Sequence, residues 1–465
     1  MLYSSDLITQ YLPWYYIVSQ SIKQLQIPHW ISSIYGGGYP LLAQGETGIL
    51  SPINFIVLFL MPFPPSVNFL YLVYGLIAIS GVYLFLKAHN LDNLSSVFGA
   101  ITFIFSGFFL TRYFQPSIIF TAALLPWGFY LIKKSQVNAK VLFILTLLIY
   151  LQITAGHLQI VFISIAAYIA YTALTCLFNK QKFALLAKVV TFLCLGLLLS
   201  SIQILPSAKL FDLSQRRNWD KNMIFSYSLP PSHLVTYLSP NAFGVSQPGD
   251  DLNFSQFGGG FWEINITVWT LPFILSLLPA FLIITKRADN KDLTKAITIF
   301  YIMWIAFILL GLGGFFKPNL IFAKIPDYPF RAPARYMLVS TFAASVLSSV
   351  GFYKLSQLFS KKVSYLFFFV VIFVSFFQIY DQLNNYFIFK DKKFIMLDVK
   401  NNIREDDLWT PLPINPSIKT LYSQSQMQNI FKNEFRKGAV ISLSGLLILL
   451  ILFRRNYFKG VRTFQ

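Results

Sequence analysis

The chain is poor in the residues that build covalent or metal-bound frameworks. Its 465 residues include only two cysteines and four histidines. Cys176 and Cys194 both fall inside apolar runs, so the sequence offers neither a disulfide framework nor a Cys-x-x-Cys metal site. The histidines show no spacing typical of metal ligands, and the candidate site is therefore expected to hold no resident metal built from them.

Charge is equally scarce. Charged residues make up 12% of the chain and hydrophobic residues 55%, which excludes a soluble globular protein. We therefore predict an all-α polytopic integral membrane protein with eleven transmembrane helices. The apolar runs long enough to span a bilayer lie near 66–86, 95–113, 115–132, 139–155, 158–178, 185–205, 262–285, 294–314, 333–353, 363–381 and 438–453.

The short loops predict the orientation of these spans. Lysine and arginine recur in alternate loops, from Lys87 to the C-terminal tail, and cytoplasmic loops retain such residues. These loops hold 18 Lys and Arg against three Asp, and so carry +15 of the formal net charge of +19. The excess of basic residues is thus explained by membrane topology and by contact with anionic membrane lipids, and it does not require nucleic-acid binding. We expect a cytoplasmic C-terminus in the inner (plasma) membrane.

This orientation places the first 65 residues outside the cytoplasm. No apolar span precedes this loop, so we expect that one upstream spanning helix is missing from the chain. The complete protein would then have twelve transmembrane helices. Residues 49–64 are apolar but are broken by Pro52, Pro62 and Pro64, with Pro65 directly after them, and are interpreted as interfacial or re-entrant. The predicted organisation is a first extracytoplasmic loop at 1–65, a transmembrane core at 66–381 with outer loops at 206–261 and 315–332, an extracytoplasmic segment at 382–437, and a last helix with a basic tail at 438–465.

The first outer loop carries a candidate catalytic carboxylate. Asp6 and Gln10 are spaced by one turn of an α-helix and are followed by Tyr11, Trp14 and other aromatic residues. A carboxylate can deprotonate an acceptor hydroxyl as a general base, and aromatic rings can cover the apolar faces of a sugar. The alternative is a helix N-cap at Asp6 followed by an ordinary interfacial aromatic belt.

A glycine-rich run follows, and it ends at Glu46. The run Tyr35-Gly36-Gly37-Gly38-Tyr39 permits close approach of the backbone to a ligand, but it lacks the strand, helix and Gly-Lys-Ser/Thr of a phosphate-binding loop. Glu46 is a candidate second carboxylate, for acid–base chemistry or for a divalent metal. The alternative is a plain surface turn.

Two further groups of polar residues lie at the predicted outer ends of spans. His157 and Gln159 sit at a junction between two spans, where they either cap a tight helical hairpin or reach the outer cavity. Arg216, Arg331 and Arg335 are cations on the outer side, against the usual bias, and arginine binds phosphate oxygens bidentately. Either they bind a lipid phosphate, for which Arg335 is the preferred member of its pair, or they form salt bridges with nearby aspartates or contact phospholipid headgroups.

The order of six short motifs resembles the bacterial membrane proteins called YfhO, which belong to the GT-C superfamily of polytopic glycosyltransferases. The resemblance extends over residues 4–355. The motifs are Asp6-x3-Gln10-Tyr11-x-Pro13, Gly45-x2-Gly48-x3-Pro52, Ala155-Gly156-His157-x-Gln159, Gln203-x2-Pro206 with Ser214-x-Arg216, Ser228-Leu229-Pro230-Pro231 with Pro240-x2-Phe243-Gly244, and Phe330-Arg331-x-Pro333-Ala334-Arg335.

The resemblance implies a GT-C-like membrane fold and a reaction class. Asp6 would be the catalytic residue, acting on a polyprenyl-phosphate-linked sugar, with an extracytoplasmic glycan, lipid or protein as acceptor. Arg216, Arg331 and Arg335 would bind the lipid phosphate, and His157 and Gln159 would border the cavity. The resemblance leaves the need for a divalent metal open.

Two other functions compete with this one. A flippase or exporter of a lipid-linked glycan should show repeat symmetry and charges near the middle of the bilayer, whereas no sequence repeat is found and the spans are expected to be nearly free of charge. The second competitor is a non-catalytic membrane protein or inactive fragment.

Overall fold

The computed structural model describes residues 6–32, 38–179, 183–239, 242–243, 260–284, 291–387 and 424–461. Most of the predicted extracytoplasmic segment 382–437, the start of the glycine-rich run, and Pro240 and Gly244 of one quoted motif lie outside these residues. In the described part, helices form every regular element, and the one β-bridge joins Ile31 to Tyr39.

The helices of the first half of the chain are η1 Leu7–Tyr11, α1 Leu12–Lys23, α2 Leu41–Gln44, α3 Pro52–Leu60, α4 Pro65–Lys87, α5 Asn93–Ile104, α6 Gly107–Thr111, α7 Pro116–Ala123, α8 Leu125–Ser135, η2 Ala139–Val141, α9 Leu142–Ala155, α10 Leu158–Phe178, α11 Ala184–Leu199 and α12 Ser201–Asp212. Those of the second half are η3 Gln215–Asn218, α13 Lys221–Ile224, η4 Pro231–Tyr237, α15 Phe261–Ile264, α16 Thr270–Ile284, α17 Lys291–Gly311, η5 Gly313–Phe315, η6 Lys317–Lys324, η7 Pro333–Tyr336, α18 Met337–Ser356, α19 Lys361–Phe387 and α22 Gln424–Val461.

The chain is an all-α polytopic membrane protein, as its composition predicts. Eight described helices, some made of two consecutive elements, are long and apolar enough to cross a bilayer, or nine if the bent pair α11–α12 is one span. Two shorter apolar helices, at Ala139–Ala155 and Thr270–Ile284, coincide with the two remaining predicted segments. Helix α3 has nine residues, about 14 Å at 1.5 Å per residue, and is too short to span.

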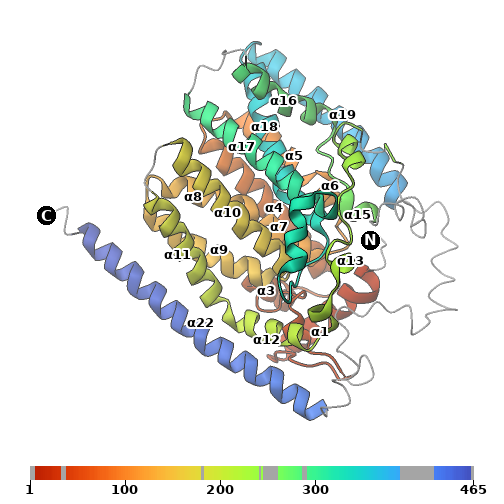
Figure 1. Ribbon diagram of the computed structural model, residues 1–465, viewed down its shortest axis with the longest axis vertical. Helices are drawn as coiled ribbons and strands as arrows, with labels where there is room; N and C mark the ends of the chain where they lie inside the picture. Colours follow the sequence, from red (N-terminus) through yellow and green to blue (C-terminus); the bar gives the residue numbers. More distant parts are fainter. Residues whose placement is uncertain are drawn as a thin grey trace.

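The position of each helix in the bundle follows its composition. Helix α18 is rich in Ser, Thr and Ala, and almost all of it is buried, because small side chains allow neighbouring helices to approach closely. Helices α19 and α22 carry large exposed apolar side chains and lie at the edges of the bundle (Figure 1). Such faces suit contact with lipid chains.

Two predicted spans differ from the structure. The span predicted at 185–205 is broken at Ser200, where α11 and α12 meet at 72°. The span predicted at 262–285 begins only at Thr270, because residues 265–269 are not helical and Trp262 and Glu263 belong to the short helix α15.

The two ends of the bundle differ in chemistry. We call the end at which Arg112, Gly156 and Arg335 meet the polar end. Helices α4 and α18 start near that end and finish with Lys87 and Lys354 in their last turns, so these lysines lie at the opposite end. The polar end therefore holds the candidate site, away from these lysine-bearing helix ends.

Candidate functional site

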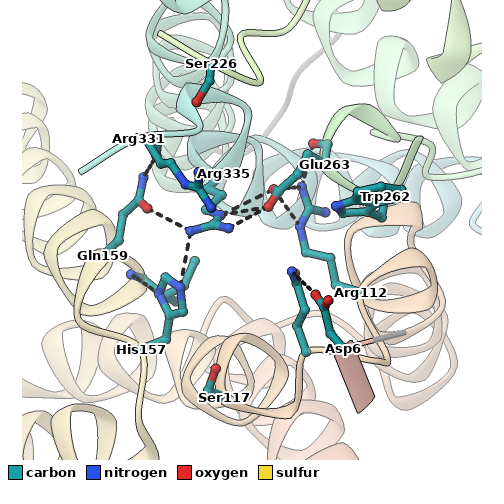
Figure 2. A network of polar contacts seen from close by, with 12 residues as sticks. Asp6, Arg112, Ser117, His157, Gln159, Ser226, Trp262, Glu263, Arg331 and Arg335 are labelled. Carbon is teal, nitrogen blue, oxygen red and sulfur yellow. Dashed lines mark hydrogen bonds and ion pairs between the residues drawn. The ribbon is translucent and has the colours of Figure 1, made fainter. Parts of the chain in front are cut away.

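A buried carboxylate shared by two arginines forms the centre of the polar end. Glu263, in α15, pairs with Arg335 at 2.6 Å and with Arg112 at 3.1 Å. Arg112 follows α6 directly, and its guanidinium also donates to the Glu263 carbonyl oxygen at 2.5 Å and lies 4.1 Å from the Phe108 ring centre. Figure 2 shows Glu263 between the two guanidinium groups.

The charges in this group are almost fully enclosed, and Arg335 is the most exposed of the three at 11%. Side-chain exposure is 0% for Arg112 and 2% for Glu263. Burial by itself would raise the pKa of Glu263, but the charges and hydrogen bonds of Arg335 and Arg112 outweigh it and lower that pKa to about 2. Glu263 is thus ionised at any physiological pH, and the group of three carries one excess positive charge.

Arg112 and Glu263 were not among the predicted site residues. Both fall inside predicted spans, at 95–113 and 262–285, but the apolar helices in the structure cover Asn93–Thr111 and Thr270–Ile284, so Arg112 and Glu263 lie just outside them. An ionisable residue inside an apolar span is itself a signal for a functional or paired site. The sequence contains that signal, but it does not indicate that Arg112 pairs with Glu263, 151 residues later.

Arg335 connects the buried carboxylate to the predicted His157 and Gln159. One terminal nitrogen of its guanidinium lies 3.2 Å from His157 Nε2 and donates to Gln159 Oε1 at 3.0 Å. The other terminal nitrogen and Nε donate to Glu263. The structure therefore brings Arg335, His157 and Gln159 together, as Figure 2 shows. Because protein groups occupy most of its N–H donors, Arg335 is suited to orienting its neighbours.

His157 caps a helix, as one of the two alternatives considered for it predicts, and its other ring nitrogen faces Arg335. Its Nδ1 is 3.4 Å from the backbone nitrogen of Ile160 at the start of α10, while its Nε2 faces Arg335. Burial, followed by the nearby charges of Arg335 and Arg216, lowers the pKa of His157 well below its usual value. His157 is therefore neutral at physiological pH.

The hairpin that carries His157 also contacts the loop that carries Glu46. Gly156 has a φ of +125°, and a Cβ at this position would lie 3.0 Å from the Glu46 Cα. Gly48, with φ of +60°, lies against the carbonyl oxygens of Thr154 and Ala155. These glycines allow the two segments, more than 100 residues apart, to pack backbone against backbone.

Asp6 does not serve as a helix cap, in contrast to the capping alternative. It has helical backbone angles and no side-chain bond to a backbone N–H. Its Oδ2 instead accepts from Gln115 Nε2 at 3.5 Å. Burial raises the pKa of Asp6; the Gln115 contact opposes this, and the charges of Glu46 and Glu263 raise it further. Such a carboxyl group is a stronger base than an exposed one.

Gln10 lies on the same turn, but that turn is not α-helical. Residues Leu7–Tyr11 form a π-helix, closed by the bond from Leu12 N–H to Leu7 O. Because a π-helix has more residues per turn than an α-helix, Gln10 does not lie directly one turn above Asp6 as the sequence predicts. Gln10 is partly exposed, and its side chain makes no hydrogen bond within the described part of the chain.

Glu46 is held by a buried tyrosine. The Tyr11 hydroxyl donates to Glu46 Oε2 at 2.6 Å and lies 2.9 Å from Ser117 Oγ. Burial and the adjacent Glu46 raise the pKa of Tyr11 well above its usual value, so its proton stays on the phenol. Glu46 is thus oriented toward the region of Asp6 by a neutral donor.

Two arginines stack on one indole ring. The guanidinium carbon of Arg216 is 5.1 Å from the Trp219 ring centre, and that of Arg331 is 5.5 Å from the same centre and 5.8 Å from Tyr227. The guanidinium of Arg216 forms no ion pair with a described residue. Burial, and then the cations Arg331 and Arg335 against the opposing charge of Glu46, lower the pKa of Arg216 to about 10.

The neighbouring Arg217 behaves differently. It pairs with Asp327 at 3.4 Å, and both side chains are about half exposed, so the salt-bridge alternative describes Arg217. The remaining predicted arginine, Arg331, precedes Ala332, which has a φ of 56°. The Ala332 and Ala334 N–H groups donate to the carbonyls of Ser226 and Tyr227, and these bonds hold the strained turn.

An aromatic cleft opens beside the arginines. Gln159 and Arg331 line the polar side of this cleft, and Gln159 Nε2 also donates to the Arg331 carbonyl oxygen. The other lining residues are mainly apolar: Ile224, Phe225, Leu310, Gly313, Phe322, Tyr328, Phe330, Pro333 and Tyr336. The cleft thus joins a cationic end to a hydrocarbon-like wall.

The described residues contain no group of three or more His, Cys, Asp or Glu side chains placed to bind a metal ion. The chain matches no family model, no curated protein and no solved structure, so the chemistry of this site has to be argued from its own geometry.

Proposed function

We propose that this chain is a GT-C-like membrane glycosyltransferase, related to the YfhO proteins, that acts at the extracytoplasmic face of the bacterial inner membrane. It transfers a sugar from a polyprenyl-phosphate donor to an envelope glycan, lipid or protein. The C-terminus is cytoplasmic in this proposal, because the lysine-bearing helix ends lie opposite the polar end.

One observation carries the proposal: two carboxylates and two stacked arginines lie at the same end of the bundle. Asp6 has a raised pKa to which Glu46 contributes, and Arg216 and Arg331 share the Trp219 ring. A base beside an anion-binding pair is what the displacement of a phosphate by a hydroxyl group requires.

In the proposed reaction, Asp6 takes the proton of the acceptor hydroxyl as the acceptor oxygen bonds to the anomeric carbon. The bond from that carbon to the phosphate oxygen breaks, and the electron pair leaves with the lipid phosphate, whose charge Arg216 and Arg331 stabilise. A single displacement inverts the anomeric configuration. Arg335 is assigned a supporting role, orienting His157 and Gln159, because its donors are occupied.

The aromatic cleft supports a lipid-linked donor over a soluble nucleotide sugar. Its lining is mainly apolar, as contact with the hydrocarbon next to a phosphate requires, and Arg331 lies at its cationic side. Export of a lipid-linked glycan is the second candidate, favoured by the buried charges of Arg112 and Glu263. Those charges neutralise each other at one end of the bundle, which suits a structural anchor better than a transport path.

The test is mass spectrometry of lipid-linked sugars and envelope glycans in cells that lack the gene. Wild type should restore a missing glycan modification and consume the accumulated polyprenyl-phosphate sugar, whereas Asp6→Asn should not. Asp212→Asn is the matched control, because Asp212 is exposed. If Asp6→Asn restores the glycan fully, Asp6 is not the base and transport becomes the better account.

A further inference from the structure

The bend between α11 and α12 is closed by the C-terminal helix. A helix start leaves backbone N–H groups without acceptors in the helix. At this bend the Ile202 N–H, in the first turn of α12, donates to Ser442 Oγ of α22 at 2.9 Å. Ser442, 240 positions later in the chain, thus accepts the hydrogen bond of a backbone N–H group that the 72° break leaves without a partner in its own helix.

Two glycines let α22 approach the bend this closely. Gly438 lies four residues before Ser442 and Gly445 three residues after it, so all three share one face of α22. A Cβ on Gly438 would overlap the Ser201 carbonyl oxygen, and one on Gly445 would lie 3.2 Å from the Leu199 nitrogen. Figure 1 shows α22 running along α11 and α12. The three small residues therefore straddle the bend.

Helix α12 in turn holds the loop that carries Glu46. Gln203 Nε2 donates to the Leu42 carbonyl at 2.9 Å, and Ser207 Oγ donates to the Ala43 carbonyl at 2.7 Å. Helix α2 ends at Gln44, two residues before Glu46. The direction of α12 therefore sets where Glu46 stands.

The same helix leads to Arg216. Helix α12 ends at Asp212, and Ser214 caps the short helix η3, with its Oγ accepting from the Arg216 N–H at 3.2 Å. On this side α22 adds apolar contacts of its own. Its Met427 and Phe431 are buried in a cluster with Ala43, Leu210 and Leu213.

We propose that Ser442 and Gly438 are positioning residues that brace the α11–α12 bend and so place Glu46 and Arg216 within the site. They touch no substrate in this proposal. The inference rests on the proposed function only in treating Glu46 and Arg216 as site residues; the mechanical link itself is independent of the reaction.

The test is hydrogen–deuterium exchange of the full chain in lipid nanodiscs. The Gln44 and Gly48 N–H groups are hydrogen-bonded, so exchange in residues 41–48 reports on this loop. In Ser442→Ala we expect exchange there and in residues 213–218 to become roughly tenfold faster, as expected for loss of a buried hydrogen bond. Exchange in α5, which lies elsewhere in the bundle, should not change.

Ser444→Ala is the matched control, because Ser444 is exposed and its hydroxyl bonds only to the Val440 carbonyl of its own helix. If Ser442→Ala does not fold, Gly445→Ala tests the same joint with a milder overlap. Unchanged exchange in the folded Ser442→Ala chain would overturn the brace. The expected exchange in a chain without transferase activity would instead retain the brace and refute the proposed function.

Discussion

At the scale of single residues, the site contains two kinds of ionised side chain: those paired with one another and those that form no ion pair in the described part of the chain. Glu263, Arg112 and Arg335 satisfy one another in a buried group. Asp6 and Arg216, by contrast, form no ion pair with a described residue. Buried charges that are not paired are costly and are commonly found at functional sites.

The pKa of Asp6 predicts a pH dependence. As general base, Asp6 must be ionised, so transfer should fail as pH falls through its pKa, which lies above the ordinary value of 3.8. Glu46→Gln removes a negative charge that raises this pKa, so the acidic limb of the kcat/KM profile should move to lower pH. Asp212→Asn should leave the limb in place, and an unmoved limb in Glu46→Gln would contradict the assignment.

Glu263→Gln should destabilise the folded protein by about 3–5 kcal/mol, because it leaves two buried arginines without their carboxylate. Asp327→Asn, in the half-exposed pair with Arg217, should cost at most about 1 kcal/mol. Unfolding in detergent, followed by intrinsic fluorescence, compares the two variants; equal losses would refute the view that burial makes the Glu263 group structurally important.

The same measurement in wild type has a predicted pH dependence. The folded-state pKa of Glu263 is about 2, against an ordinary value of 4.5. A lowered pKa stabilises the ionised folded state, so this contribution is fully present above about pH 5 and is lost as pH falls from there toward 2.

At the scale of elements, glycine positions decide which segments meet. Gly156→Ala places a Cβ 3.0 Å from the Glu46 Cα in a backbone with φ of +125°, and should destabilise the chain by more than about 1 kcal/mol. Gly75→Ala in α4 is the control, since a Cβ there meets nothing within 4 Å. Thermal unfolding of both variants checks this, and a neutral Gly156→Ala would show that the loops can separate without cost.

At the scale of the whole molecule, the separation of the polar end from the lysine-bearing helix ends predicts topology. In a chain whose Cys176 and Cys194 are replaced, Asp212→Cys should react with a membrane-impermeant maleimide in intact cells, and Lys361→Cys only after permeabilisation. The opposite pattern would place the site in the cytoplasm and exclude a polyprenyl-phosphate donor delivered at the outer face.

The sequence by itself determined the class of the protein. Hydropathy is a local property, so the eleven apolar segments each coincide with a helix or helix pair, and the polar residues His157, Gln159 and Arg335 were recognisable as unusual before any contact was known. The π-helical turn at Leu7–Tyr11 and the break at Ser200 were not predicted, since apolar composition does not distinguish a straight helix from a wide or bent one.

Only the tertiary structure decided which of these residues meet. Glu263 reaches Arg112 across 151 positions and Arg335 across 72, and Ser442 reaches Ile202 across 240. A charge or a small residue has many sterically acceptable partners in a chain of this length. The packing of the helices selects the partner, because a buried charge or N–H group without a partner raises the free energy of the folded state.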